Sequence, residues 1–213
     1  MKFCVLGLGR FGYHVATRLA ENGMEVLGVD SSEEIVASIR DNITQAICMR
    51  VHDEASLRSI GVDEMDTVIV AMGENFAGSI LITALLKKKL AIPLVITRAV
   101  SEIHKEILLL IGADQIILPE REIGHSLADN LSLPFQVISR ITKNFSISQV
   151  KAPQTFAGKT LKKIGLAENY GLNCLGIRRE TDIVPVTKDY IVQEDDLMIV
   201  AGSNKNLENI ANL

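Results

Sequence analysis

The sequence predicts an α/β protein in which a doubly wound parallel sheet is followed by a smaller α+β lobe. Three observations carry this prediction. Apolar runs of strand length alternate with helical patterns from the start of the chain to about Leu133. A glycine-rich turn joins the first of these runs to the first helical pattern. After Pro134, short strand-like runs follow one another with few helices between them, which is typical of an α+β arrangement.

Six strand-like runs and five helical patterns make up the alternating region. The strand-like runs are Phe3–Leu6, Glu25–Val29, Gln45–Met49, Thr67–Met72, Leu94–Arg98 and Gln115–Leu118. The helical patterns are Tyr13–Glu21, Glu33–Asp41, Glu54–Ile60, Phe76–Leu90 and Glu102–Ile111. Because Val and Ile run almost continuously through the strands, we expect a parallel sheet that is buried on both faces. Strands joined by helical crossovers make a doubly wound, Rossmann-like domain.

The turn after the first strand carries the pattern GxGxxG over residues 7–12. Gly7 lets the chain turn tightly, Gly9 lets the backbone approach a phosphate, and Gly12 lets the helix pack closely on the strand. Asp30 ends the second strand, at the distance downstream where an acid that binds ribose is expected. The N–H groups of the helix N-terminus can then hold a phosphate. The strand, the glycine spacing and the acid together predict a nucleotide site. The alternative is a Rossmann-like fold whose site binds no ligand.

Asp30 also narrows the choice of nucleotide. A carboxylate suits a free ribose diol and repels a 2′-phosphate, and Ser31 and Ser32 follow with no arginine to receive that phosphate. NADP is therefore disfavoured, whereas NAD, NADH and simple adenine nucleotides remain open. The alternative role for Asp30 is the N-cap of the helix that starts near Ser32.

The second region is expected to form a small lobe. Its strand-like runs and short helices are Phe135–Val137, Ser146–Val150, Thr160–Ile164, Leu175–Arg178, Leu197–Ala201 and Asn206–Ile210. We place the boundary near residues 134–143, which gives domains 1–134 and 135–213. The helix around Ile123–Leu133 has a spaced set of apolar residues, Ile123, Leu127, Leu131 and Leu133. We interpret it as a crossover or interface element, and the alternative is a helix that covers the sheet.

Composition narrows the class of protein. The 213 residues are enough for one large or two modest domains, and their 47% hydrophobic content can fill a core. A net charge of −4 without a basic cluster argues against a nucleic-acid partner. The first strand-like run starts within the first three residues, so we expect no signal peptide before it. The longest apolar runs fall short of the ~20 residues that a membrane span needs. We therefore expect a cytoplasmic protein whose cysteines, Cys4, Cys48 and Cys174, are small core residues.

The residues of a catalytic site are not evident. Dehydrogenases of the short-chain type need a Tyr with a Lys four residues on, but Thr17, Cys174 and Glu194 hold that place after the three tyrosines. The four histidines lack an orienting carboxylate in a shared motif, and no GxSxG, HExxH or P-loop sequence is present. We expect no catalytic residues and no enzyme. The alternative from another class is an NAD-dependent oxidoreductase or redox-sensing module.

Further features follow the glycine-rich turn in a fixed order. After Asp30 come His52-Asp53, the Val68–Ala71 strand, Arg98, Gly112-Ala113-Asp114, Leu118-Pro119-Glu120, Tyr170-Gly171 and Glu194-Asp195-Asp196. With these motifs the chain resembles, over essentially its whole length, the cytoplasmic regulatory subunits of Trk/Ktr potassium uptake systems, the stand-alone RCK (KTN) proteins. The resemblance implies a nucleotide lobe followed by a regulatory lobe, and a role in potassium transport.

An adenine nucleotide is the ligand that the resemblance implies, ATP or ADP, with NAD or NADH as the alternative. The residues implied for binding it are Gly7, Gly9, Arg10, Phe11, Gly12, Asp30, Asp53 and Arg98. Arg10 would contact phosphates, unless it is only a surface arginine. Arg98 is a second candidate phosphate contact, unless it pairs with Glu102. Asp53 would lie beside the adenine, after His52, which replaces the family's usual Gly.

Partners are also implied by the resemblance. Relatives dimerise through the nucleotide lobes and assemble into an octameric ring beneath a membrane-embedded, potassium-translocating subunit. The chain would then lie at the inner face of the cell membrane, held there by that partner. Glu120 corresponds to a carboxylate that in some relatives contributes to a divalent-cation site between subunits. Its alternative role is an acid stabilised by the dipole of the following helix.

Overall fold

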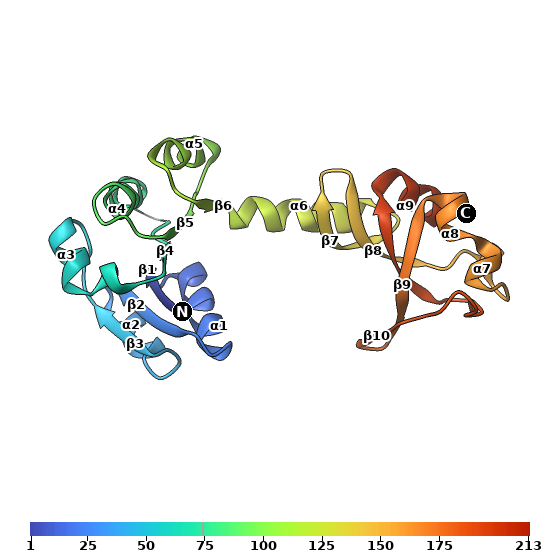
Figure 1. Ribbon diagram of the computed structural model, residues 1–213, viewed down its shortest axis with the longest axis horizontal. Coiled ribbons are helices and arrows are strands. Elements are labelled where there is room, and N and C mark those ends of the chain that lie inside the picture. The colour runs from blue at the N-terminus through green and yellow to red at the C-terminus, as the bar shows by residue number, and fades with distance from the viewer. Residues whose placement is uncertain (74) are drawn as a thin grey trace. The chain divides into compact units, whose positions relative to one another are not determined.

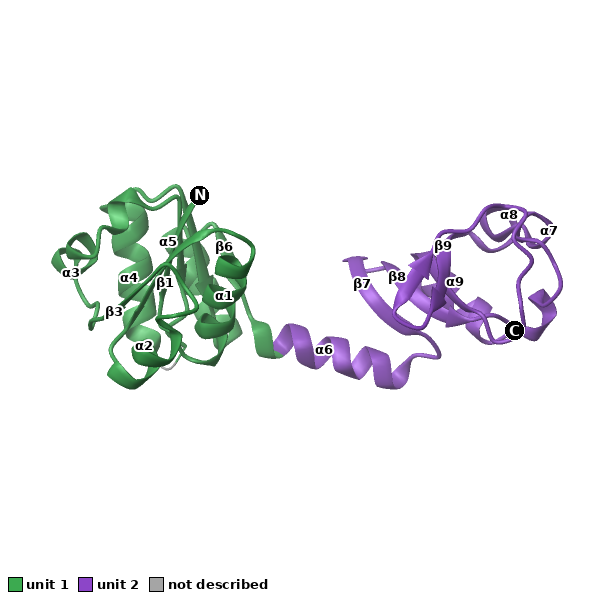
Figure 2. Cartoon of the chain, turned by 90° about the horizontal axis from the view of Figure 1, so that it is seen from below, with its two compact units in different colours: residues 1–120 green, residues 121–213 purple. Residues whose placement is uncertain are grey.

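The computed structural model describes residues 1–73 and 75–213, and the chain divides into two compact units. Unit 1 spans Met1–Glu120 and unit 2 spans Arg121–Leu213, as the colours of Figure 2 show. Each unit has its own buried core. The predicted fold class, a parallel α/β sheet followed by a smaller α+β lobe, is confirmed.

Unit 1 is built on a parallel sheet with the strand order β3-β2-β1-β4-β5-β6. Its strands, drawn as arrows in Figure 1, are β1 (Lys2–Leu6), β2 (Glu25–Asp30), β3 (Gln45–Cys48), β4 (Thr67–Val70), β5 (Leu94–Arg98) and β6 (Gln115–Ile117). Val5 of β1 pairs with Gly28 on one side and with Ile69 on the other. The chain order therefore reverses at β1. In such sheets, ligands bind beyond the carboxyl ends of the strands at this switch point.

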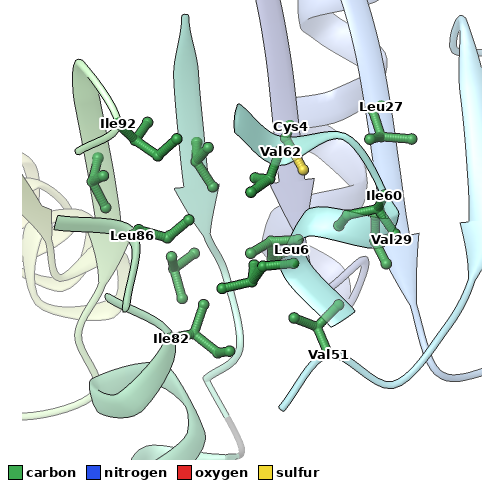
Figure 3. Close-up of a cluster of buried hydrophobic side chains, with 14 residues drawn as sticks. Cys4, Leu6, Leu27, Val29, Val51, Ile60, Val62, Ile82, Leu86 and Ile92 are labelled. Carbon is green, nitrogen blue, oxygen red and sulfur yellow. The ribbon is translucent and has the colours of Figure 1, made fainter. Parts of the chain in front are cut away.

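Helices cover both faces of the parallel sheet. They are α1 (Arg10–Glu21), α2 (Glu33–Ile39), α3 (Glu54–Ser59), the short 3₁₀ turn η1 (Val62–Glu64), α4 (Phe76–Lys88) and α5 (Glu102–Ile111). Val5 packs with Ala16 of α1 and Val36 of α2 on one face. Leu6, the next residue of β1, packs with Ile82 of α4 on the other face, as Figure 3 shows. Successive side chains of a strand point to opposite faces, so both must be apolar when both are covered.

Helix α6 (Pro119–Ser132) begins in unit 1 and continues into unit 2. None of its residues is buried, and Ile123, Leu127 and Leu131 are 69%, 59% and 78% exposed. The alternative interpretation, a helix that covers the sheet, is therefore wrong.

The end of α6 is tied to unit 2 by polar contacts. The side-chain oxygen of Asn130 accepts a hydrogen bond from the backbone N–H of Val137 at 2.8 Å. Asp129 forms an ion pair with Arg140. The division between the units accordingly falls between Glu120 and Arg121, whereas the boundary expected near residues 134–143 lies at the other end of α6.

Unit 2 contains an antiparallel sheet with the order β10-β9-β11-β8-β7. Its elements are β7 (Gln136–Thr142), β8 (Phe145–Lys151), η2 (Gln154–Phe156), α7 (Leu161–Ile164), α8 (Leu166–Tyr170), β9 (Leu172–Arg179), β10 (Asp182–Val184), β11 (Leu197–Ser203) and α9 (Asn204–Ala211). Leu172, Met198 and Leu207 are among its buried core residues. The sequence pattern missed α8 and β10, because one turn of helix and three exposed strand residues leave no periodic signal.

The three cysteines differ in exposure. Cys4 is buried in the core of unit 1, and burial raises the pKa of its thiol to about 12. Cys174 is half-buried, whereas Cys48 is exposed, so the expectation of three core cysteines is wrong for Cys48. Cys48 lies on β3, an edge strand with a neighbour on one side only. Across the described residues, every helix is too short or too polar to cross a membrane.

Candidate functional site

A cleft of about 1030 Å³ opens at the carboxyl edge of the parallel sheet. The segments that follow strands β1 to β5 line it, together with the first turn of α6. All of its lining residues belong to unit 1. The cleft therefore lies where the topology of an open parallel sheet places ligands.

The glycine-rich turn forms one wall of this cleft. Gly7 has a φ of +91°, a conformation that side chains disfavour, and its N–H donates to the carbonyl of Val29 at 2.8 Å. A Cβ on Gly12 would lie 1.9 Å from the carbonyl oxygen of Gly7, so only glycine lets α1 pack this closely on the turn. Gly9 has an ordinary φ of −60°, and a Cβ there would meet nothing within 4 Å. The backbone at Gly9 is therefore open to a ligand.

Helix α1 presents an uncapped N-terminus to the cleft. Gly9 is its N-cap and supplies no side-chain hydrogen bond. By contrast, the N-cap side chains of α2, α3, α4 and α5 each accept a backbone N–H. The first turn of α1 contains no acid and starts with Arg10, which lines the cleft. A cation at the positive end of a helix dipole is unfavourable by itself, so this turn suits an anion.

Asp30 lies at the end of β2 and faces the same turn. Its carboxylate accepts the backbone N–H of Leu8 at 2.7 Å and that of Ser32 at 2.9 Å. A carboxylate has about four lone-pair positions, so two remain for hydroxyl donors. Ser32 is the N-cap of α2, with its hydroxyl accepting from Ile35. The alternative role of Asp30 as this N-cap is therefore wrong.

The loop after β3 contributes a third side of the cleft. Met49, Arg50, Val51 and His52 all line it. The His52 ring lies 3.1 Å from the carbonyl of Arg50 and 3.6 Å from the Asp53 carboxylate. Asp53 itself caps α3, and the backbone N–H of Ser56 holds the pKa of its carboxyl below the usual range. Asp53 is not among the residues that line the cleft.

Arg98 extends from the end of β5 and touches three other segments. Its guanidinium pairs with Glu120 in the first turn of α6 and lies 5.9 Å from the centre of the Phe11 ring. It also packs so closely on Gly73 that a Cβ there would lie 2.1 Å from its Nη1 atom. The Glu120 carboxyl has a pKa below its usual range, held there by its own backbone N–H and by Arg98. The cleft thus contains a basic and an acidic group already in contact.

Most of the residues expected to bind a nucleotide lie around one cleft. The cleft is lined by Gly7, Gly9, Arg10, Phe11, Asp30, Arg98 and Glu120. Gly12 does not line the cleft and instead lets α1 pack closely on the glycine-rich turn. Asp53 also lies outside the lining. Arg50 and Met49 were not expected, because a loop without a motif gives no sequence signal for a binding role. The described residues contain no group of three or more side chains that could hold a metal ion, so a cation at Glu120 stays a prediction.

Two proteins of Ktr potassium uptake systems are similar in sequence to this chain over nearly its whole length. Ktr system potassium uptake protein C of Bacillus subtilis (strain 168) is 35% identical over 208 residues, which are 95% of this chain and 92% of that protein. Ktr system potassium uptake protein A of the same strain is 34% identical over 215 residues, which are 99% of this chain and 96% of that protein.

Solved structures of the GsuK channel share the fold. The GsuK channel bound to NAD superposes with a TM-score of 0.68 at 16% identity and covers 99% of this chain but 39% of the channel chain. GsuK bound to ADP superposes with a TM-score of 0.54 at 20% identity, over 62% of this chain and 34% of that chain. Two domain families match directly, the TrkA-N domain over residues 3–119 and the TrkA-C domain over residues 146–213. The chain therefore belongs to the family of potassium uptake proteins in which a TrkA-N domain is followed by a TrkA-C domain.

Proposed function

We propose that this chain is the nucleotide-binding regulatory subunit of a membrane potassium uptake system of the Trk/Ktr type. It binds an adenine nucleotide in the cleft of unit 1 and passes the identity of that nucleotide to a potassium-translocating partner. The observation that carries the proposal is the uncapped, acid-free N-terminus of α1, which faces a cleft shared with the Asp30 carboxylate. The relatives' names supply the process, potassium uptake.

The chemistry of the cleft supports a nucleotide with a phosphate at α1 and a ribose at Asp30. Backbone N–H groups and the dipole of α1 stabilise negative charge, and the Arg10 guanidinium adds a bidentate donor. The free lone pairs of Asp30 accept from a ribose diol. The base then lies beyond the ribose, toward Val51 and His52 of the β3 loop. ATP and ADP fit this order of groups, as do NAD and NADH.

Assembly and location follow from the same proposal. Helix α6 has the apolar residues Ile123, Leu127 and Leu131 on its exposed surface, and a second copy of the chain would cover them. Dimers formed through the nucleotide lobes, with α6 as a further contact between copies, build the octameric ring, which lies at the cytoplasmic side of the membrane against its partner. A divalent cation at Glu120, shared between subunits, would accompany the bound phosphates.

Potassium flux into vesicles that contain a Trk/Ktr-type membrane subunit tests the proposal. With this chain added, we expect ATP and ADP to give different flux, and Asp30→Ala to abolish the difference. Asp41→Ala, which removes an exposed carboxylate away from the cleft, is the matched control and should behave as wild type. Flux that is the same with and without the chain under every nucleotide would contradict the proposal, as would oxidation or reduction of a bound nicotinamide.

A further inference from the structure

Arg50 is an arginine of the cleft to which the proposed phosphate and ribose contacts give no role. It follows the edge strand β3, and its side chain is exposed. It lines the cleft together with its neighbours Met49 and Val51. Within residues 1–73 and 75–213, no ion pair or hydrogen bond engages its guanidinium. The flat faces and N–H donors of this group are therefore open to a ligand.

The order of the strands places Arg50 at the end of the cleft where the base of a nucleotide would lie. The proposed phosphate site follows β1, and the proposed ribose acid, Asp30, ends β2. Cys48, the last residue of β3, pairs with Asp30, and the backbone N–H of Met49 donates to the Asp30 carbonyl at 2.8 Å. Neighbouring strands lie about 4.8 Å apart, so β3 is about 10 Å from β1. Arg50 is thus one strand further from the phosphate turn than the ribose acid is.

The segment that carries Arg50 is held in place and borders an apolar wall. The backbone N–H of His52 donates to the Ser56 hydroxyl at 3.2 Å, and the His52 ring lies 3.1 Å from the Arg50 carbonyl. Val51 belongs with Ile82 of α4 to one buried cluster, which Figure 3 shows. Val51 and Ile82 both line the cleft. The base end of the cleft therefore combines apolar side chains with a guanidinium.

We infer that Arg50 binds the base of the nucleotide by stacking its guanidinium on the flat face of the ring. This inference rests on the proposed nucleotide site and assigns a residue to the base, for which that proposal names only a direction. A guanidinium is planar and weakly hydrated, and it stacks on aromatic rings with a cation–π attraction. Stacking contacts the face of the base, which every purine has, rather than its edge groups. Arg50 thus favours ligands that carry a base over those that carry phosphate and ribose alone.

Isothermal titration of the full chain with ADP tests the stacking contact. Arg50→Gln removes the guanidinium and should weaken ADP binding about fivefold. Arg50→Tyr supplies a flat ring without a charge and should bind ADP within about twofold of the wild type. Arg40→Gln is the matched control, because it removes the same charge at the end of α2, outside the cleft lining, and should leave the affinity unchanged.

Two outcomes of this titration would overturn the inference while leaving the nucleotide site intact. One is equal ADP affinity of the wild type and Arg50→Gln. The other is ADP binding by Arg50→Tyr that is as weak as binding by Arg50→Gln, because the contact would then depend on charge.

Titration with NAD and NADP separates stacking from a phosphate contact of the same arginine. Stacking predicts that Arg50→Gln weakens the binding of both dinucleotides by the same factor, because both carry the same base. A wild-type preference for NADP that disappears in Arg50→Gln would mean that Arg50 binds a 2′-phosphate, and the inference would be wrong. A wild-type chain that binds neither ADP nor ATP would instead overturn the proposed function, and the inference with it.

Discussion

Gly9 combines an ordinary backbone conformation with open space next to the cleft. Its φ of −60° is accessible to any residue, and a Cβ there meets nothing within 4 Å. Gly9→Ala should therefore leave the fold intact while placing a methyl group where a phosphate approaches the N-terminus of α1. We expect the thermal stabilisation by ADP, about 2.7 kcal/mol at 100 times the wild-type dissociation constant, to be largely lost.

Gly124→Ala is the matched control for this prediction. Gly124 lies on α6, outside the cleft lining, and also has open space around its Cα. Its ADP-dependent shift in melting temperature should equal that of the wild type. A full ADP shift in Gly9→Ala would mean that no phosphate lies against this turn.

Gly12, in contrast to Gly9, has no space for a side chain. A Cβ on it would lie 1.9 Å from the carbonyl oxygen of Gly7, a backbone atom that cannot move without opening the turn. Gly12→Ala should destabilise unit 1 by about 3 kcal/mol, the upper range for overpacking a tight contact. Urea denaturation measures this change when the unfolding of unit 1 is monitored by hydrogen exchange of its backbone N–H groups. A urea midpoint for unit 1 within error of the wild type would refute the assigned packing role.

The positions of several cleft residues could be predicted from the sequence, whereas their binding roles stay predictions. Gly7, Gly9 and Asp30 line the cleft because their spacing after a strand places them at the carboxyl edge of the sheet. Arg98 was placed correctly at the cleft because the carboxyl ends of parallel strands share one edge. Its partner Glu120 could not be predicted, since that contact depends on where α6 starts in space. Asp53 was expected at the cleft, but a helix-capping role uses the same residue type.

At the scale of elements, α4 and α5 are joined by a buried histidine. His104 is fully buried on α5, and its ring contacts the Ser79 hydroxyl of α4 at 2.9 Å. Its other nitrogen accepts the backbone N–H of Val100 at 3.3 Å, and the Phe76 ring lies 4.4 Å away. Nδ1 as an acceptor requires the neutral ring. Burial lowers the pKa of His104 in the folded protein.

This burial predicts a dependence of stability on pH. The unfolded chain binds a proton at His104 near its ordinary pKa of about 6.5, whereas the folded chain binds it only at lower pH. The free energy of unfolding should therefore fall as the pH drops below about 6.5. Urea midpoints at pH 7.5 and 5.5 should differ more in wild type than in His104→Gln, with the exposed His125→Gln as control. An equal difference in wild type and His104→Gln would contradict the assignment.

The role of helix α6 as an interface element stays a prediction. The spacing of Ile123, Leu127 and Leu131 favours a crossover or interface helix, and all three side chains are exposed. We expect Leu127→Asp to shift the full chain to smaller assemblies in sedimentation velocity, because a buried charge opposes association. Ser126→Asp, one residue off the apolar set, is the control. Identical sedimentation of wild type and both variants would show that α6 makes no contact between copies.

At the scale of the whole molecule, the proposed octameric ring would lower the demand on each site if it switched as one unit. Moving a two-state equilibrium from 1:99 to 99:1 takes about 5.5 kcal/mol of differential binding, or roughly 0.7 kcal/mol per site over eight sites. That is about a threefold preference for one nucleotide, which one phosphate contact of Arg10 can supply. Arg10→Gln should therefore reduce the ratio of ATP to ADP affinity toward one, with a smaller effect on ADP binding alone. An unchanged ratio would remove Arg10 from the switch.

The parallel sheet and the order of its strands and helices were predicted from the sequence, because buried strands and amphipathic helices repeat with distinct periods. The division of the chain was not, because an exposed amphipathic helix such as α6 does not indicate which unit holds it. Polar contacts of Asp129 and Asn130 with β7 decide that question, and no periodicity encodes them.

Calorimetric titration of the purified full chain with ATP, ADP, NAD and NADH tests the central claim most directly. The account predicts saturable binding of an adenine nucleotide at one site per chain, which Asp30→Ala abolishes or weakens strongly and Asp41→Ala leaves unchanged. A folded chain that binds none of the four nucleotides, or that binds one equally well with Ala at position 30, would contradict it.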